Sequence, residues 1–264
     1  MKGWRLARRA VLVGLASATL AVAQAAAALE LPDLIDRNKP SVTLVGTYAE
    51  TDSPRFAFRG SGFVVGDGNL AITNAHVLPP ALTGEVGRRL VIQVRRSSGE
   101  WGVRNASVVS LDKARDLALL RFEGPAAPAV TLRKDGVREG TPIALMGFPL
   151  AGALGFSTVT HKGIVSAVTG IAMPTPSAQS LNASAVLRLR EGSFDILQLD
   201  ATAYPGNSGG PVFDAERGDV IGVINMVVVK RSRESALSDP SGITYAIPAS
   251  YAAALVEQEL GAKP

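Results

Sequence analysis

The feature that most restricts the fold of this chain is a series of about a dozen short apolar runs, each ended by glycine, proline, aspartate or asparagine. The runs have the length and spacing of β-strands, and Val91–Arg95 shows the partial alternation of a strand with one buried face. They are Val42–Val45, Gly62–Val65, Leu70–Thr73, Leu90–Val94, Leu117–Phe122, Ile143–Met146, Gly163–Val168, Val186–Leu189, Ile196–Leu199, Pro211–Phe213, Val220–Val229 and Thr244–Ile247. This pattern predicts an all-β sandwich or barrel.

Helical signals are confined to two segments. We expect a single turn over Asn74–Leu78, and a helix over Pro248–Leu260, where apolar residues follow one side and Gly261 acts as a stop signal. Between the two halves of the chain, Gly124–Thr141 is interrupted by prolines and glycines and shows little periodicity. We therefore expect a linker in this segment.

The N-terminus has the pattern of a secretory signal peptide. Four basic residues and no acidic ones occur in the first nine positions, and no charge follows from Ala10 to Leu29. Small residues at Ala23–Ala25 and Ala26–Ala28 offer two cleavage sites, so residues 1–28 are interpreted as a signal peptide that exports the chain to the periplasm or the exterior. The alternative is a retained membrane anchor, because this uncharged stretch can just span a bilayer.

Charge and cysteine content narrow the possible partners. The formal charge is +4, from 27 basic and 23 acidic residues, and removing the signal peptide would leave 23 of each. The mature domain is thus expected to be neutral and soluble and not to bind nucleic acid. The absence of cysteine excludes disulfides and thiolate chemistry, and two separated histidines give no recognisable ligand set, so neither metal nor cofactor is expected.

The segment Gly206–Pro211 (GNSGGP) is the most informative motif. Glycines around Ser208 permit tight backbone geometry that exposes its hydroxyl and turns N–H groups outward. Such N–H groups can stabilise the oxyanion of an acyl-transfer reaction by about 3–4 kcal/mol per donor. Taken alone, the motif is more often a Gly-Ser turn of a hairpin than a catalytic segment.

A nucleophilic serine needs a base, and the chain has two histidines. His76 ends an apolar strand, whereas His161 lies in a polar turn that leads into another strand. The third member would be a carboxylate that orients the imidazole, for which Asp116 is favoured over Asp112 because a strand follows it directly.

The order of these residues separates fold classes. An α/β-hydrolase carries its histidine after the serine, but both histidines precede Ser208, so that fold is excluded. The subtilisin order, Asp before His before Ser, remains formally possible with Asp116 and His161. The many predicted strands and few predicted helices argue against that fold.

Ile72–Val77 (ITNAHV), Asp116–Leu120 (DLALL) and Gly206–Pro211 resemble the three catalytic motifs of trypsin-like serine proteases, and most of all those of bacterial HtrA/Deg-type enzymes. Further matches are Gly60–Phe63, Gly163–Ala167 and Tyr245–Pro248, and the resemblance extends over roughly residues 40–255. It implies two six-stranded antiparallel β-barrels with the active site between them and a short C-terminal helix. The barrels would occupy residues 29–134 and 135–264.

The resemblance also assigns roles. It makes Ser208 the nucleophile, His76 the general base and acid, and Asp116 the partner that orients His76, with the N–H groups of Gly206 and Ser208 as the oxyanion hole. His161 matches no catalytic position and is interpreted as a loop residue. The implied activity is a serine endopeptidase acting on polypeptides through an acyl-enzyme.

Two departures from the family pattern bear on regulation. HtrA-type enzymes commonly carry PDZ domains after the protease, whereas about 15 residues follow Tyr245–Pro248 here, too few for one. Zymogen-type relatives have an aspartate before the nucleophile that binds a newly cut N-terminus, but this chain has Asn207. Any gating is therefore expected from loops, and the long segments 170–193 and 230–242 are either functional or tolerated insertions.

The resemblance places a specificity pocket near the nucleophile. Its expected lining is Thr202 and Ala203 at the base, the strand of Asn225, Met226 and Val227 along one wall, and Gly242 opposite. That strand could also pair with the substrate backbone. Because Thr202 is neutral where a trypsin-like pocket has an acid, we expect small or medium apolar residues at the substrate position before the cleaved bond (P1).

Two other functions use the same fold. One is a catalytically silent protein that binds peptides or unfolded chains, and the other is a membrane-anchored protease, should the N-terminal segment be retained. The complete set of triad residues favours the soluble enzyme over the silent binder.

Overall fold

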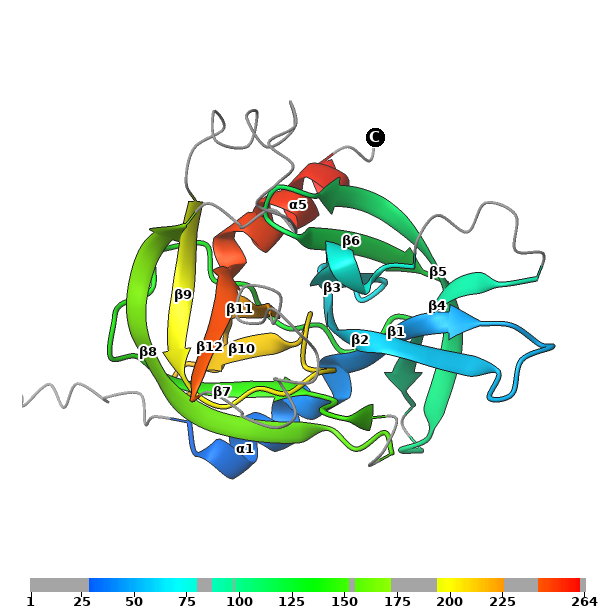
Figure 1. The fold of residues 1–264 in the computed structure, drawn as a ribbon, viewed down its shortest axis with the longest axis horizontal. Helices are drawn as coiled ribbons and strands as arrows, with labels where there is room; N and C mark the ends of the chain where they lie inside the picture. Colours follow the sequence, from blue (N-terminus) through cyan, green and yellow to red (C-terminus); the bar gives the residue numbers. More distant parts are fainter. Residues whose placement is uncertain are drawn as a thin grey trace, which may run out of the picture.

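Two closed, six-stranded antiparallel barrels make up the chain, as the computed structural model shows (Figure 1). The structure describes residues 29–79, 87–96, 98–151, 155–171, 194–225 and 242–261. The predicted signal peptide therefore lies outside the described residues, as do Val186–Leu189 and the end of the run Val220–Val229. The predicted all-β class and the pair of barrels are confirmed.

The first barrel contains β1 to β6 in the spatial order β1-β2-β3-β6-β5-β4. Its strands are β1 (Val42–Tyr48), β2 (Phe56–Val65), β3 (Leu70–Asn74), β4 (Arg89–Arg95), β5 (Trp101–Asp112) and β6 (Leu117–Phe122). The second barrel repeats this order as β7-β8-β9-β12-β11-β10. Its strands are β7 (Pro142–Gly147), β8 (Val159–Ile171), β9 (Phe194–Asp200), β10 (Pro211–Asp214), β11 (Val220–Asn225) and β12 (Ile243–Pro248).

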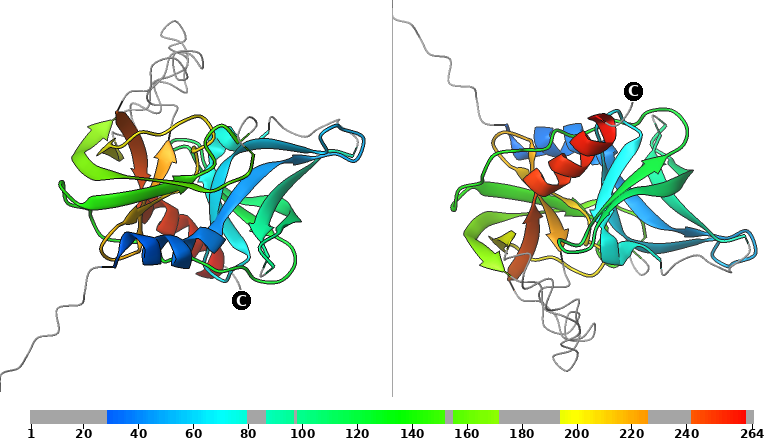
Figure 2. Two further views of the ribbon diagram at one scale, coloured as in Figure 1. Left: turned by 90° about the horizontal axis from the view of Figure 1, so that it is seen from below. Right: turned by 90° about the horizontal axis from the view of Figure 1, so that it is seen from above.

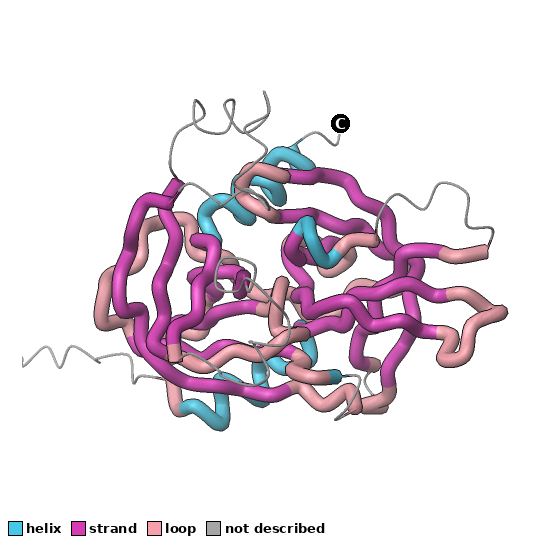
Figure 3. Tube along the Cα trace, viewed as in Figure 1, coloured by secondary structure: helices cyan, strands magenta, loops and turns pink. Residues whose placement is uncertain are grey.

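Short helices precede the first strand, follow the last one or lie between strands of the first barrel (Figure 3). They are α1 (Leu31–Asn38), the 3-10 turns η1 (Lys39–Ser41) and η2 (Ala75–Val77), and α5 (Ala249–Gly261). The expected turn after the third strand and the expected C-terminal helix correspond to η2 and α5. Figure 2 shows α5 across the seam of the molecule, where it contacts β11 and β12 of the second barrel and β5 and β6 of the first.

Helix α1 is an element that the apolar runs did not predict. Its first turn contains Pro32 and Asp33, and its last turn contains Arg37. Proline is preorganised for a helix start, and these charges complement the helix dipole, so the local sequence supports the helix. Leu34, in the middle of this helix, is fully buried.

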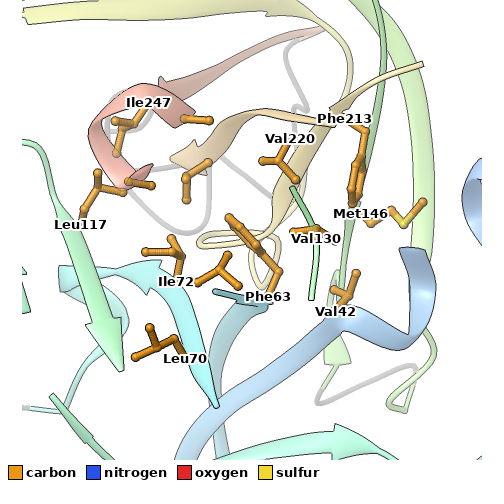
Figure 4. Close-up of a cluster of buried hydrophobic side chains, with 14 of the residues drawn as sticks. Val42, Phe63, Leu70, Ile72, Leu117, Val130, Met146, Phe213, Val220 and Ile247 are labelled. Atoms are coloured by element: carbon orange, nitrogen blue, oxygen red, sulfur yellow. The ribbon is translucent and has the colours of Figure 1, made fainter. Parts of the chain in front are cut away.

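The largest core cluster crosses the boundary between the barrels (Figure 4). Phe63 and Ile72 of the first barrel meet Met146 and Phe213 of the second, with Leu34 of α1 in the same cluster. Two smaller clusters fill the interiors of the individual barrels. The barrels therefore share apolar packing and form one continuous interior.

The segment Gly124–Thr141 connects β6 to β7 and is anchored to the second barrel. Leu132 bridges to Val220, and the nearly buried Arg133 binds Asp214 and Asp219 at 2.7 Å each. These contacts hold the crossing point between the barrels in one place.

Two searches of the described residues gave negative results. No helix in these ranges is long and apolar enough to cross a membrane. Nor does this part of the chain gather three or more histidine, aspartate or glutamate side chains in an arrangement able to hold a metal ion.

Candidate active site

His76 and Asp116 meet at one end of the first barrel, close to the second. His76 lies in η2 directly after β3, and Asp116 ends the turn that leads into β6, the strand paired with β3. Asp116 Oδ2 lies 2.5 Å from His76 Nδ1, and Asp116 Oδ1 accepts the His76 backbone N–H at 2.8 Å. One carboxylate thus binds both the ring and the backbone N–H of the histidine and fixes both in place.

The backbone of Asp116 is held in an uncommon conformation. Its φ of 56° lies in the left-handed region, which costs a residue other than glycine about 1–3 kcal/mol unless its surroundings compensate. The Asp116 carbonyl accepts hydrogen bonds from the Ala75 N–H and from Asn74 Nδ2, each at 3.1 Å. The strand that precedes His76 thus also secures the carboxylate residue.

A residue of the second barrel completes the partners of Asp116. Asn225, at the end of β11, is fully buried and donates from Nδ2 to Asp116 Oδ2 at 2.8 Å. This hydrogen bond favours the ionised carboxylate and keeps it directed at His76. The side chain of Asn225 is therefore directed at the carboxylate. The expectation that its strand lines the pocket wall stays a prediction.

Ser208 lies in the turn between β9 and β10 and is pinned to both barrels. Its carbonyl accepts the N–H of Ser61 on β2 at 2.9 Å, and the next residue, Gly209, donates its N–H to Ile224 O at 2.9 Å. Because Ile224 precedes Asn225, β11 contacts the serine turn and the buried carboxylate through adjacent residues. The structure thus brings the turn of Ser208 to the seam where His76 and Asp116 lie.

A glycine without space for a side chain brings the histidine and serine turns together. A Cβ at Gly60 would lie 2.6 Å from Val77 Cγ2 and 3.1 Å from the carbonyl oxygen of Ser208. Only the backbone of Gly60 on β2 therefore lies between Val77, the residue after His76, and the carbonyl of Ser208. Arg59 adds to this contact, since its guanidinium donates to the carbonyls of Val77 and Leu78 at 2.6 and 2.9 Å.

The turn around Ser208 leaves two N–H groups available. Asn207, Gly209 and Gly210 each donate a backbone hydrogen bond. Across the described part of the chain, the N–H groups of Gly206 and Ser208 have no such acceptor. These are the two groups expected to form the oxyanion hole, and Gly206 adopts a φ of 103° that suits glycine.

The expected pocket residues are partly brought together. Gly242 accepts the N–H of Ala201 at 3.1 Å, which places it beside Thr202, and Thr202 is half-buried. The Ala203 side chain packs into the core cluster of the second barrel. Met226 and Val227 lie outside the described residues.

His161 does not lie in a loop, contrary to expectation. It belongs to β8, opposite Leu145 of β7, and its ring lies 5.9 Å from that of Tyr204. Burial lowers the pKa of His161 below its ordinary value, because the positive form loses hydration. Residues 159–162 thus form the start of a strand and not a turn, so the expected loop position of His161 is wrong.

The arrangement is suited to proton transfer at a serine. A carboxylate fixes the Nδ1 side of His76, which leaves Nε2 for exchange with a hydroxyl. The roles of Asn225, Arg59 and Gly60 were missed from the sequence. Of the three, only Gly60 lies in a recognised motif, Gly60–Phe63. The hydrogen bonds of Asn225 and Arg59 join segments that are distant in sequence, and they leave no local pattern.

Comparisons with known proteins agree with this geometry. The family described as trypsin-like peptidase domain matches residues 60–223. The mitochondrial serine proteases HTRA2 of Drosophila pseudoobscura pseudoobscura and Drosophila persimilis are each 32% identical over 207 residues, which is 78% of this chain and 40% of theirs. The chain thus spans about two fifths of the length of these relatives.

Two solved structures of HtrA/Deg-type proteins are similar to this chain in fold. A structure of the HtrA-type protease AlgW with a tripeptide is 25% identical and superimposes with a TM-score of 0.60, covering 89% of this chain and 64% of that one. The crystal structure of Deg5 is also 25% identical, with a TM-score of 0.58 and coverage of 84% and 90%.

Proposed function

The chain belongs to the trypsin-like peptidase family, and from this premise we propose that it is a serine endopeptidase whose triad is Ser208, His76 and Asp116. The observation that carries the proposal is the hydrogen-bonded chain from Asn225 through Asp116 to His76, beside the pinned turn of Ser208. A family match alone would not assign these roles; the hydrogen bonds that join these side chains support the assignment.

In the proposed reaction, the Ser208 hydroxyl attacks the carbonyl carbon of the scissile peptide bond while His76 accepts its proton. The N–H groups of Gly206 and Ser208 bind the oxyanion, and His76 then protonates the leaving amine as the C–N bond breaks. Water next attacks the acyl-enzyme, giving its proton to His76, which returns it to Ser208. Asp116 stabilises the imidazolium in both halves.

Labelling with a fluorophosphonate probe tests this function directly, because the probe reacts with an activated serine. We expect labelling of the wild type and its loss in Ser208→Ala. Ser61→Ala is a poor control, since Ser61 binds the Gly206 carbonyl, so the exposed Ser98→Ala serves as the matched serine control. Absence of labelling in the folded wild type would favour the peptide-binding alternative.

For the substrate, we propose polypeptides with a small or medium apolar P1 residue. The neutral Thr202 beside Gly242 supports this preference, and the AlgW structure with a tripeptide shows that a related protease binds peptides. Peptide substrates that differ only at P1 provide the test. Higher kcat/KM for valine or alanine than for arginine or lysine is expected, and the reverse order would refute the preference.

We propose further that the protein is exported, with cleavage after the signal-like N-terminus. The four basic residues followed by an uncharged stretch support this proposal. The intact mass of the exported protein tests it, because cleavage removes about 28 residues and a retained anchor removes none.

A further inference from the structure

Arg115 immediately precedes Asp116 and joins the strained carboxylate turn to the second barrel. Its backbone N–H donates to Asp112 Oδ1 at 2.9 Å, and its Nη1 donates to Asp112 Oδ2 at 2.8 Å. Both bonds close the turn that ends at Asp116. The hydrogen bond to Asp112 also raises the pKa of Arg115, although burial opposes the rise, so the guanidinium remains charged throughout the working pH range.

The guanidinium of Arg115 also contacts two aromatic rings of the second barrel. Its central carbon lies 4.5 Å from the ring centre of Tyr251 on α5 and 5.9 Å from that of Phe194 at the start of β9. The two rings meet edge to face, with centroids 6.1 Å apart, and the Tyr251 hydroxyl accepts the Asp195 N–H at 3.3 Å. In such cation–π contacts the positive guanidinium is attracted to the electron-rich faces of the rings.

Proteolysis by a split triad requires a fixed relation between the barrels. Asp116 and His76 come from the first barrel and Ser208 from the second, so movement of the carboxylate turn relative to the second barrel would misalign them. On the Asp116 side, Asn225 fixes the carboxylate itself. Arg115, in the same turn as Asp116, ties the adjoining backbone to the second barrel through a separate set of contacts.

We propose that Arg115 is a positioning residue that holds the strained turn of Asp116 against Tyr251 and Phe194, and so keeps the Asp116–His76 pair aligned with Ser208. This inference rests on the proposed protease function. Arg115 touches no reacting atom, and its effect passes through Asp116.

The chain offers a matched control in Arg121. Its guanidinium also joins the first barrel to α5, with Asp67 at 3.2 Å and Glu259 at 3.1 Å, but it lies near the far end of β6 from Asp116. Arg115→Met is expected to lower kcat by about fivefold or more while KM changes by less than about twofold, since the cation–π contacts with Tyr251 and Phe194 are lost. Arg121→Met is expected to leave both within about twofold.

A conservative variant and a double-mutant cycle separate positioning from general stability. Arg115→Lys keeps the charge but not the flat stacking group, so it should recover part of the lost kcat. Arg115→Met and Tyr251→Leu should be non-additive in kcat, because each removes the same contact. Equal losses in the Arg115 and Arg121 variants, or additive losses in the cycle, would overturn the proposal.

The low-field proton NMR signal of the short His76–Asp116 hydrogen bond reports on alignment without catalysis. It should broaden or move upfield in Arg115→Met and remain unchanged in Arg121→Met. Fluorophosphonate labelling of the wild type tests the protease function separately. An unlabelled wild type whose NMR signal still responds to Arg115→Met would refute the protease function alone, and an unchanged signal in Arg115→Met would refute the positioning role alone.

Discussion

At the scale of single residues, the site depends on atoms that are far apart in sequence. Asn225 donates to the carboxylate of Asp116 across the two barrels, and Gly209 allows the serine turn to approach β2 and β3. One residue acts through a buried hydrogen bond and the other through the absence of a side chain. Each effect can be tested by one substitution.

Asn225→Ala is expected to lower kcat/KM by about 10- to 100-fold, because a hydrogen bond to a charged group contributes about 1.5–3 kcal/mol. Peptide hydrolysis by the folded variant measures the effect. Asn69→Ala is the matched control, since Asn69 donates to Phe122 O and Gly124 O on the first barrel away from the site. Wild-type kcat/KM in the Asn225 variant would contradict the orienting role.

Gly209→Ala is expected to destabilise the fold and abolish labelling by the serine probe. Its φ is +83°, and an added Cβ would lie 2.2 Å from Ser61 O and 2.4 Å from Thr73 Oγ1. Strain of this kind costs about 1–3 kcal/mol before any clash is counted. Gly136→Ala, where an added Cβ meets nothing within 4 Å apart from its chain neighbours, should stay within about 0.5 kcal/mol in urea unfolding. Similar stabilities of the two variants would refute this explanation.

At the scale of elements, apolar runs found the strands that have buried faces and missed those that do not. β5 is mostly exposed or half-buried along its length, so Trp101–Asp112 contains no long apolar run, and only pairing with β4 and β6 defines it. The motifs of the proposed triad could be recognised because each lies in one short segment. The contacts of Asn225 and Arg115 were not, because they arise where separate elements meet.

The ion pairs of Arg133 with Asp214 and Asp219 make the stability of the connector between the barrels depend on pH. Burial raises the pKa of Asp219, but hydrogen bonding and charge attraction from Arg133 outweigh it, so the pKa lies below the ordinary 3.8. A carboxylate whose pKa is lowered by folding contributes stability above its unfolded value. This contribution is lost as the pH falls below about 4 toward the folded pKa.

Arg133→Met is therefore expected to cost about 3–5 kcal/mol at pH 7, because it leaves buried carboxylates without their partner. The cost should shrink at pH 3, where Asp219 takes up a proton more readily without Arg133. Urea unfolding at both pH values provides the measurement. The neighbouring Lys134→Met removes only the exposed contact with Glu257 and should cost about 1 kcal/mol or less at either pH. An Arg133 cost that does not depend on pH would contradict the assignment.

At the scale of the whole molecule, the two barrels have the same strand order but share a continuous apolar interior. The first barrel supplies His76 and Asp116, and the second supplies Ser208 and Asn225. A site divided in this way depends on the packing between the barrels as much as on the fold of each. Helix α1 contributes to that packing through Leu34.

Leu34→Ala is expected to destabilise both barrels together by about 2–5 kcal/mol, the usual cost of removing a buried leucine side chain. Native-state hydrogen exchange should show the same loss of protection for core amides in β3 and β11. The exposed Leu260→Ala, which lies on α5, should have a much smaller effect. Loss of protection in one barrel only would show that the barrels unfold independently.

The placement of α1 also has a consequence for the chain during its synthesis. Leu29 donates its N–H to Glu216 O, and Leu34 shares a core cluster with Phe213. At about 5–20 residues per second, these partners leave the ribosome about ten to forty seconds after α1 does. Throughout that interval the apolar side of α1 lacks the part of its packing surface that the second barrel supplies, so the helix is fully covered only once the second barrel closes.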